Sequence, residues 1–230
     1  MTTSVKEEEN LKTKIEDLAA FIGNTPLFPL RNLVQKDGVT IYAKLEWEQL
    51  GGSVKARPAY QIIKEAIFNG KLQSGRQLLD ASSGNTGIAY ATICRSLGIP
   101  LTLCMPENAS QERKTILNAL NINLLYTAGS GTTDEAIQLA QKLQDEHPSH
   151  YCYVDQYSNN ENMKAHYYGT AEEILSETSH KITHFVAGLG TTGTFTGTSL
   201  RLKEAMNEVN LIGLQPDAAM HGLEGWNHLD

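Results

Sequence analysis

Short apolar runs alternate with longer amphipathic segments along the chain from about residue 40. The short runs predict strands, and the segments with apolar positions three or four apart predict helices. Alternation of these two patterns is typical of βαβ units, so we predict an α/β fold with mainly parallel sheets. Strands are expected at 41–45, 77–81, 101–105, 124–126, 151–154, 182–187 and 211–215, and helices at 58–69, 86–97, 110–120, 132–146, 162–176 and 194–208.

The composition is that of an ordinary globular protein. Of the 230 residues, 40% are hydrophobic and 20% are charged, which suffices for a substantial core. The net charge of −7 disfavours general binding to nucleic acid or to anionic membranes. No stretch approaches the ~20 apolar residues of a membrane span. The residues 1–11 lack the apolar core of a signal peptide and are expected to form a polar leader.

The cysteines and histidines indicate neither a disulfide framework nor a metal site. Cys94, Cys104 and Cys152 are odd in number and far apart, so we expect buried thiols in a reducing, cytoplasmic setting. No set of His, Cys and carboxylate residues has the spacing of a metal site, and we therefore expect no bound metal.

A loop rich in glycine and threonine, GLGTTGT at 188–194, follows one expected strand and opens the next helix. The glycines permit a tight turn with converging N–H groups, and the helix adds its positive end. The hydroxyl groups add donors that suit a phosphate monoester. The loop also matches the GxGxxG fingerprint, with Asp217 beyond the next strand, so an NAD-dependent oxidoreductase remains an alternative. The residues expected to bind phosphate are Gly190, Thr191, Thr192, Gly193 and Thr194.

A second loop, SSGNTG at 82–87, also lies between a strand and a helix. Its hydroxyl and N–H groups are of the right kind to bind a carboxylate. Asn85 can donate a hydrogen bond to a ring hydroxylate. An ordinary helix cap formed by Ser83 or Asn85 is the simpler alternative.

Lys55 stands after two glycines and a serine, just before an expected helix. The field of the helix N-terminus lowers the pKa of an amine there and favours its use as a nucleophile or base. A surface lysine is the ordinary alternative for such a residue. An amine, a carboxylate loop and a phosphate loop in one chain together suggest a cofactor held as a Schiff base.

These three segments, in this order, resemble the cysteine synthase and cystathionine β-synthase family of pyridoxal-phosphate enzymes of fold type II. The sequences GNTPL at 23–27, KLE at 44–46 and Gln156 add to the match. The loop GTTGT and the later IGLQP at 212–216 are most similar to the cysteine synthase B branch. Ala56 and Gln49-Leu50 depart from the family, which commonly has Asp and Asn-Pro there.

The resemblance implies a tryptophan-synthase-β-like fold with two open, mainly parallel sheets flanked by helices. It implies a smaller domain at 35–155 and a larger phosphate-binding domain at 12–34 plus 156–230. Family domains run to roughly 300 residues, so the last part of the larger domain is expected to be missing. A homodimer is also implied.

The resemblance further implies the chemistry. Lys55 holds pyridoxal phosphate and removes the α-proton, and the reaction makes L-cysteine from an O-activated serine, such as O-acetylserine, and sulfide or a thiol. A catalytically weak cofactor-binding or partner-binding homologue is the alternative. Cofactor contacts are expected from Lys55, Asn85 and 190–194, and substrate contacts from Ser82, Ser83, Gly84, Thr86 and Gln156.

Overall fold

The computed structural model describes residues 3–33, 36–73, 75–129 and 133–218. Residues 219–230, the end of the expected larger domain, lie outside this described part. The elements in chain order are α1 (Thr3–Asp17), η1 (Leu18–Phe21), β1 (Leu27–Pro29), β2 (Tyr42–Lys44), α2 (Ala56–Phe68), β3 (Gln77–Ala81), α3 (Asn85–Leu97), β4 (Leu101–Pro106), α4 (Gln111–Ala119), β5 (Asn123–Thr127), α5 (Thr133–Glu146), β6 (Tyr151–Tyr153), α6 (Asn160–Ala165), the π-helical turn η2 (His166–Thr170), α7 (Ala171–Glu177), β7 (His184–Gly188), α8 (Gly193–Ala205) and β8 (Asn210–Leu214).

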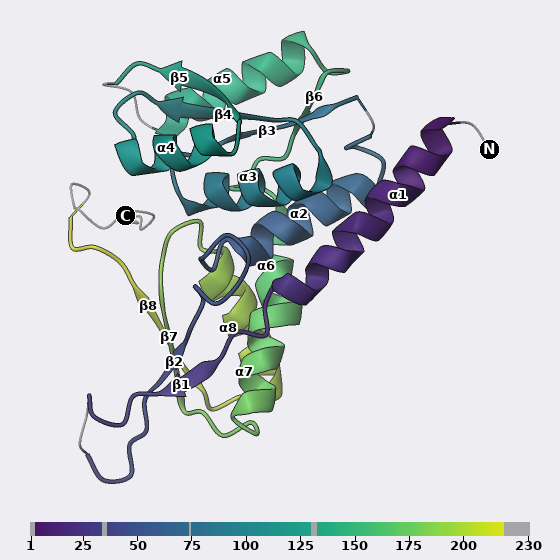
Figure 1. Cartoon of the computed structure of the whole chain (residues 1–230). Helices are drawn as coiled ribbons and strands as arrows, with labels where there is room; N and C mark the ends of the chain where they lie inside the picture. The colour runs from purple at the N-terminus through teal and green to yellow at the C-terminus, as the bar shows by residue number, and fades with distance from the viewer. Residues whose placement is uncertain (1–2, 34–35, 74, 130–132, 219–230) are drawn as a thin grey trace.

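A four-stranded parallel sheet with the order β5-β4-β3-β6 forms the upper part of the molecule in Figure 1. Helix α5 covers one face of this sheet, and α2 and α3 lie on the other. Side chains alternate between the two faces along each strand, so Leu78 and Leu103 join the core under α3 whereas Leu79 and Cys104 join the core under α5. Burial on both faces explains the apolar runs in these strands.

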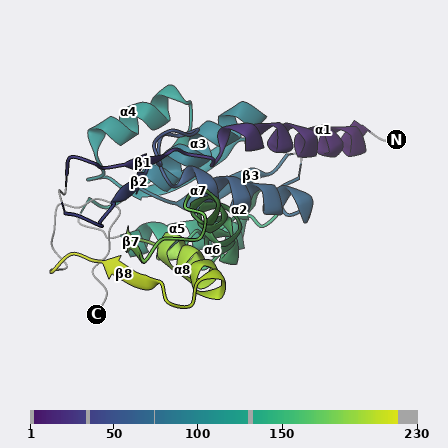
Figure 2. The same ribbon diagram turned by 90° about the horizontal axis from the view of Figure 1, so that it is seen from below.

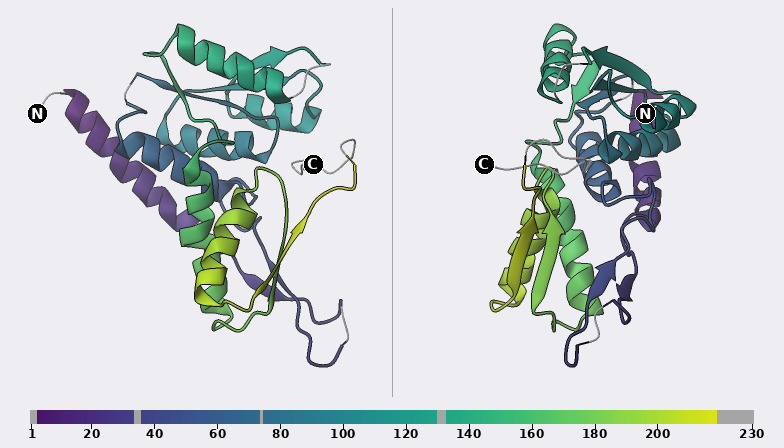
Figure 3. Two further views of the ribbon diagram at one scale, coloured as in Figure 1. Left: turned by 180° about the vertical axis from the view of Figure 1, so that it is seen from behind. Right: turned by 90° about the vertical axis from the view of Figure 1, so that its left-hand side faces the viewer.

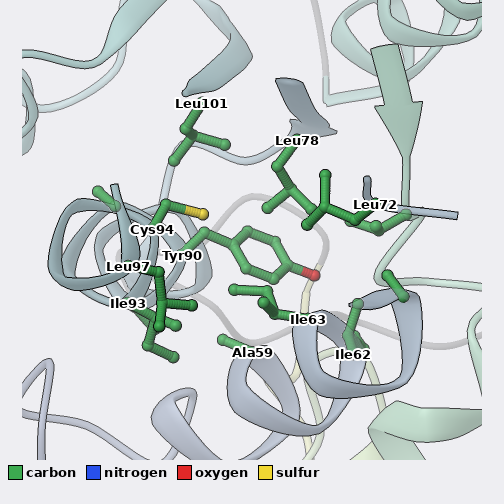
Figure 4. Packing of buried hydrophobic residues seen from close by; sticks show 14 of the residues in the cluster. Ala59, Ile62, Ile63, Leu72, Leu78, Tyr90, Ile93, Cys94, Leu97 and Leu101 are labelled. Atoms are coloured by element: carbon green, nitrogen blue, oxygen red, sulfur yellow. The ribbon is translucent and has the colours of Figure 1, made fainter. Parts of the chain in front are cut away.

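The larger of the two cores surrounds the ring of Tyr90 (Figure 4). Tyr90 is fully buried, and it is enclosed by side chains of α2, α3, β3 and β4. Helix α1 packs on the same core through Ile15, which is 0% exposed. From Thr3 onward, the segment expected as a polar leader forms the first turns of α1.

A second region is built from the parallel pair β7 and β8, their crossover helix α8, and the α6–η2–α7 segment. Figure 3 shows α8 lying beside this segment, with β7 and β8 next to it. Phe185 and Leu211 pack inward on this core. Val186 and Ile212 on the other face are 51% and 41% exposed. The predicted open, mainly parallel sheets are thus confirmed for both regions.

Strands β1 and β2 form a separate antiparallel ribbon, of which the sequence predicted β2, within the strand expected at 41–45, but not β1. Seen from below in Figure 2, the N-terminal helix α1 runs beside α2. The ribbon keeps Phe28 and Tyr42 largely exposed. It also places the residues 23–27 and 44–46 next to each other, since Leu27 pairs with Lys44.

All three cysteines are free and buried, as expected. Burial raises the pKa of the Cys94 thiol above its usual range and the pKa of Cys104 to about 12. Within the described residues, no helix is long and apolar enough to cross a membrane. Those residues also hold no group of three or more His, Cys, Asp and Glu placed to bind a metal.

Two glycines on α8 allow close packing against α6 and η2. A Cβ atom at Gly197 would lie 2.2 Å from the carbonyl oxygen of Met163. A Cβ atom at Gly193 would lie 2.1 Å from Oδ1 of Asn162. No side chain fits at either position unless the helices separate, so these glycines fix the distance between the two helices.

We expect Gly197→Ala to lower the free energy of unfolding by on the order of 2 kcal/mol. Alanine gains about 1 kcal/mol in helix propensity, but the clash with backbone outweighs this gain. Urea denaturation measures the change, with Thr196→Ala, at an exposed neighbour on the same helix, as the control. Equal stability of Gly197→Ala and the wild type would contradict the close approach.

Candidate active site

Lys55 is the N-cap residue of helix α2 and immediately precedes its first residue, Ala56. Its backbone N–H donates to Oγ of Ser53 at 3.3 Å. Gly51 and Gly52 have φ values of +84° and +67°, which side-chain-bearing residues rarely adopt. A Cβ atom at Gly51 would also lie 3.4 Å from Cα of Ala89 on α3. The two glycines therefore allow the chain to pass close to α3 and place Lys55 at the N-terminus of α2.

The Lys55 side chain shares a pocket of about 190 Å³ with the loop between β7 and α8. Burial lowers the pKa of the amine, and the carboxylate of Glu46 opposes this shift. The pocket brings together Lys55 and most of the predicted phosphate loop. Its lining is Val54, Lys55, Ala187, Gly188, Gly190, Thr191, Thr192 and Thr194.

The phosphate loop has the geometry of an anion cradle. Thr192 has φ 65° and ψ −13° and stands at the N-cap position of α8. This left-handed residue turns the chain so that the first N–H groups of a 13-residue helix follow the loop. Asn162 of α6 supports the loop from behind, because its Nδ2 donates to Oγ1 of Thr191 at 3.0 Å.

His166 also lies behind the loop and was not singled out in the sequence. It is 0% exposed, with Nδ1 2.9 Å from Oγ1 of Thr170 and Nε2 3.2 Å from Oγ1 of Thr194. Burial, together with the charges of Lys55 and Arg57, lowers the pKa of His166 to about 3. The imidazole is therefore neutral at physiological pH.

The loop 82–87 joins β3 to α3 and is closed by its first serine. Oγ of Ser82 accepts hydrogen bonds from the N–H groups of Gly84 at 3.4 Å and Gly87 at 2.9 Å. Ser82 and Thr86 are buried, Ser83 and Gly84 are partly exposed, and Asn85 is exposed. The helix cap is thus made by Ser82 rather than by Ser83 or Asn85. None of these residues lines the pocket around Lys55.

Gln156 is bonded to the end of the strand that leads into this loop. Its Nε2 donates to the carbonyl oxygen of Ala81 at 2.8 Å, and its backbone N–H donates to Asp80 at 3.2 Å. Asp80 is fully buried, and burial raises its pKa to about 7 despite these N–H donors. A buried carboxyl therefore ties Gln156 to the strand that leads into the loop.

A buried cluster of charges anchors the start of α2 next to Lys55. Arg57 is paired with two carboxylates: it binds Glu46 through Nε at 2.7 Å and Nη2 at 2.8 Å, and Glu173 through Nη1 and Nη2, both at 2.7 Å. Lys44 adds a bond to Glu173 at 2.8 Å. Burial alone would raise the pKa of Glu173, but Arg57 and Lys44 lower it to about 2. Glu173 is therefore charged at neutral pH.

These residues fit pyridoxal phosphate. The pocket offers an amine of lowered pKa at one side and a loop of threonine hydroxyls at a helix N-terminus at the other. An aldehyde carbon requires the first, and a phosphate dianion requires the second. Lys55 and the threonine loop both line this pocket of about 190 Å³.

Comparison with known proteins agrees with this fit. Residues 18–228 match the model of the family described as "Pyridoxal-phosphate dependent enzyme". The chain is 42% identical to a cysteine synthase of Aquifex aeolicus and 40% identical to a cysteine synthase B of Pseudomonas aeruginosa, covering 98% and 91% of this chain. It spans about 70% of each of these relatives.

A solved structure of a cysteine synthase from Entamoeba histolytica has the same fold. The TM-score is 0.86 at 32% identity, over 91% of this chain and 66% of that one. The chain belongs to the pyridoxal-phosphate-dependent enzyme family, with cysteine synthases as its relatives. The resemblance found in the sequence is thereby confirmed, and the interpretation of GxGxxG as an NAD site is wrong. The third glycine of that motif, Gly193, instead makes room for Asn162.

Sequence reasoning missed the residues that stand behind the site. Arg57, Glu173 and Asp80 carry no local motif, because their partners are distant along the chain. His166 and Asn162 did leave a signal, since they are four residues apart in an expected helix and so share one face.

We expect Glu173→Gln to lower the free energy of unfolding at pH 7 by on the order of 3 kcal/mol. The pKa of Glu173 is lowered from 4.5 in the unfolded chain to about 2, so its contribution is complete above pH 4.5. The contribution fades as pH falls from 4.5 toward 2, and the variant should lose that part of the acid sensitivity. Urea denaturation at several pH values measures it. Glu172→Gln, next along α7 and more exposed, is the control and should change little.

Proposed function

We propose that this chain catalyses β-replacement on an O-activated serine, such as O-acetylserine, with sulfide or a thiol as the nucleophile and L-cysteine as the product. One observation carries the proposal: the amine of Lys55 shares one pocket with the threonine loop at the start of α8. The kinship with cysteine synthases supports the choice of reaction within the larger family. Pyridoxal phosphate, when bound, supplies the electron sink for the reaction.

Lys55 is proposed to hold the cofactor as a Schiff base and then to act as the general base. Its amine must be neutral for both roles, and burial shifts its pKa in the direction that makes this easier. Glu46 limits the shift, since its carboxylate favours the protonated amine. Arg57, which binds Glu46, keeps that carboxylate turned toward α2 and out of the pocket.

The phosphate of the cofactor is proposed to bind at 190–194. Thr191, Thr192 and Thr194 line the pocket and carry hydroxyl donors, and α8 adds the positive end of its dipole. Gly190 and Gly193 are proposed to allow close approach of the backbone. Asn85 is assigned to the ring of the cofactor because it is exposed at the first turn of α3.

The substrate carboxylate is proposed to bind at the start of α3, with Gln156 beside it. Ser82 orders the turn by accepting from two N–H groups, which keeps the loop in one shape. Ser83, Gly84 and Thr86 are then assigned to contact the carboxylate through hydroxyl and N–H donors. Gln156 is held by Asp80 and by the carbonyl oxygen of Ala81, so it is fixed before substrate arrives.

The cellular setting and assembly are proposed along with the reaction. Three free, buried thiols suit the reducing cytoplasm. Exposed apolar side chains on β1, β2, β7 and β8 favour contact with a second copy, so we propose a homodimer. The division into a smaller domain at 35–155 and a larger domain at 12–34 plus 156–230 is likewise proposed, and the separate core around β7, β8 and α8 supports it.

The decisive experiment is the visible spectrum of the purified chain with pyridoxal phosphate, followed by an assay with O-acetylserine and sulfide. We expect a yellow Schiff-base band and cysteine formation in the wild type. Lys55→Ala should abolish the band and reduce turnover by at least about a thousandfold, since both nucleophile and base are lost. Lys142→Ala, at a lysine with 68% side-chain exposure, is the control and should keep both.

Two results would argue against the proposal in different ways. A band that persists in Lys55→Ala would show that another amine holds the cofactor. A normal band without cysteine formation would favour the catalytically weak homologue.

A further inference from the structure

We propose that His166 is a positioning residue that turns the hydroxyl group of Thr194 toward the phosphate-binding pocket. The inference deepens the proposed function and rests on it. His166 stands behind the loop, with Nε2 3.2 Å from Oγ1 of Thr194, which lines the pocket. A hydroxyl group has one proton, so whichever group takes that proton decides what the hydroxyl offers to an anion.

The neighbouring threonine shows how such support works. Nδ2 of Asn162 donates to Oγ1 of Thr191 at 3.0 Å, and the same Nδ2 donates to the carbonyl oxygen of Gln156 at 3.0 Å. Because Oγ1 of Thr191 already accepts a hydrogen bond from Asn162, the hydroxyl proton of Thr191 remains available for another acceptor. Thr191 can therefore donate to an anion in the pocket.

His166 can support Thr194 in the same manner only as the Nε2–H tautomer. In that tautomer Nε2 donates to Thr194, and Nδ1 accepts from the hydroxyl group of Thr170 at 2.9 Å. The opposite tautomer would take the proton of Thr194 and leave only lone pairs facing a phosphate. Lone pairs repel an anion, so phosphate binding and the Nε2–H tautomer favour each other.

The surroundings of His166 keep its ring neutral, so that the ring must adopt one of the two tautomers. The ring is fully buried, and a neutral imidazole has a single N–H to place. A protonated ring would donate to Thr194 whichever tautomer the neutral ring prefers, but burial and the charges of Lys55 and Arg57 oppose protonation. The tautomer of the neutral ring therefore decides the direction of the bond to Thr194.

The backbone holds the two supporting side chains in register with the loop. Asn162 and His166 are four residues apart, in α6 and at the first position of the π-helical turn η2, and they face the same neighbour. Gly193 and Gly197 of α8 meet Asn162 and His166 with no room for a Cβ atom. The four positions thus form a close-packed layer behind the hydroxyl groups, and π-helical turns often accompany functional sites.

Two substitutions separate positioning from packing. His166→Gln retains an amide N–H near the place of Nε2, whereas His166→Asn ends near the place of Nδ1 and withdraws the donor from Thr194. We expect the dissociation constant of pyridoxal phosphate to rise about tenfold in His166→Asn and less than about threefold in His166→Gln. Binding of pyridoxal, which has no phosphate, should be the same in all three proteins. His180→Asn, at an exposed left-handed position that suits Asn, is the control.

Nitrogen-15 NMR of the imidazole in the unliganded chain gives a readout independent of cofactor and activity. We expect a neutral His166 with its proton on Nε2. A proton on Nδ1 would overturn the proposal. Equal losses in the Gln and Asn variants, or a parallel loss of pyridoxal binding, would also overturn it, since these outcomes indicate general damage to packing.

A double-mutant cycle with Thr194→Val tests the route of the effect. If His166 acts through Thr194, His166→Asn should weaken phosphate binding much less in the Thr194→Val background. Full additivity of the two substitutions would show that His166 does not act through Thr194. A wild-type chain that binds neither pyridoxal phosphate nor pyridoxal would overturn the proposed function as well, whereas normal binding with an unchanged preference for the phosphate overturns only the role of His166.

Discussion

A single buried guanidinium holds three parts of the chain together at the active site. Arg57 has 3% side-chain exposure and binds Glu46, which follows β2, and Glu173 on α7. Isolated burial of any one of these charges would be costly, but each finds a charged partner at 2.7 Å. Gly23 lies against the cluster, and no side chain fits there because a Cβ atom would lie 2.8 Å from Oε1 of Glu173. The position of Lys55, two residues before Arg57, therefore depends on this charge cluster.

The opposite wall of the pocket depends on packing rather than charge. Helix α8 approaches α6 and η2 at two glycines, and this approach places the threonine loop over Asn162 and His166. Electrostatics and close packing thus fix the two ends of one pocket independently. A cofactor that must bond covalently at one end and by hydrogen bonds at the other needs both distances to be correct.

The sequence predicted the elements well where local signals were strong. The strand at 77–81 matches β3, and the helix at 86–97 differs from α3 by one residue, because glycine-bounded apolar runs mark these ends. Helix α1 was missed because its first turns are polar, and its apolar stripe begins only at Leu11 and Ile15. The ribbon of β1 and β2 was half missed, since three-residue strands carry little periodicity. Lys55 and 190–194 stood out through motifs, whereas Arg57 and Glu173 are 116 residues apart and are joined only by the fold.

The buried cysteines acquire a different meaning beside a site proposed to handle sulfide. Thiols react as thiolates, and raised pKa values keep Cys94, Cys104 and Cys152 protonated. A free thiolate near the pocket would compete with the incoming nucleophile for electrophiles and would exchange with polysulfide contaminants. Burial in the core thereby keeps the protein's own thiols from reacting with the sulfide or thiol of the proposed reaction.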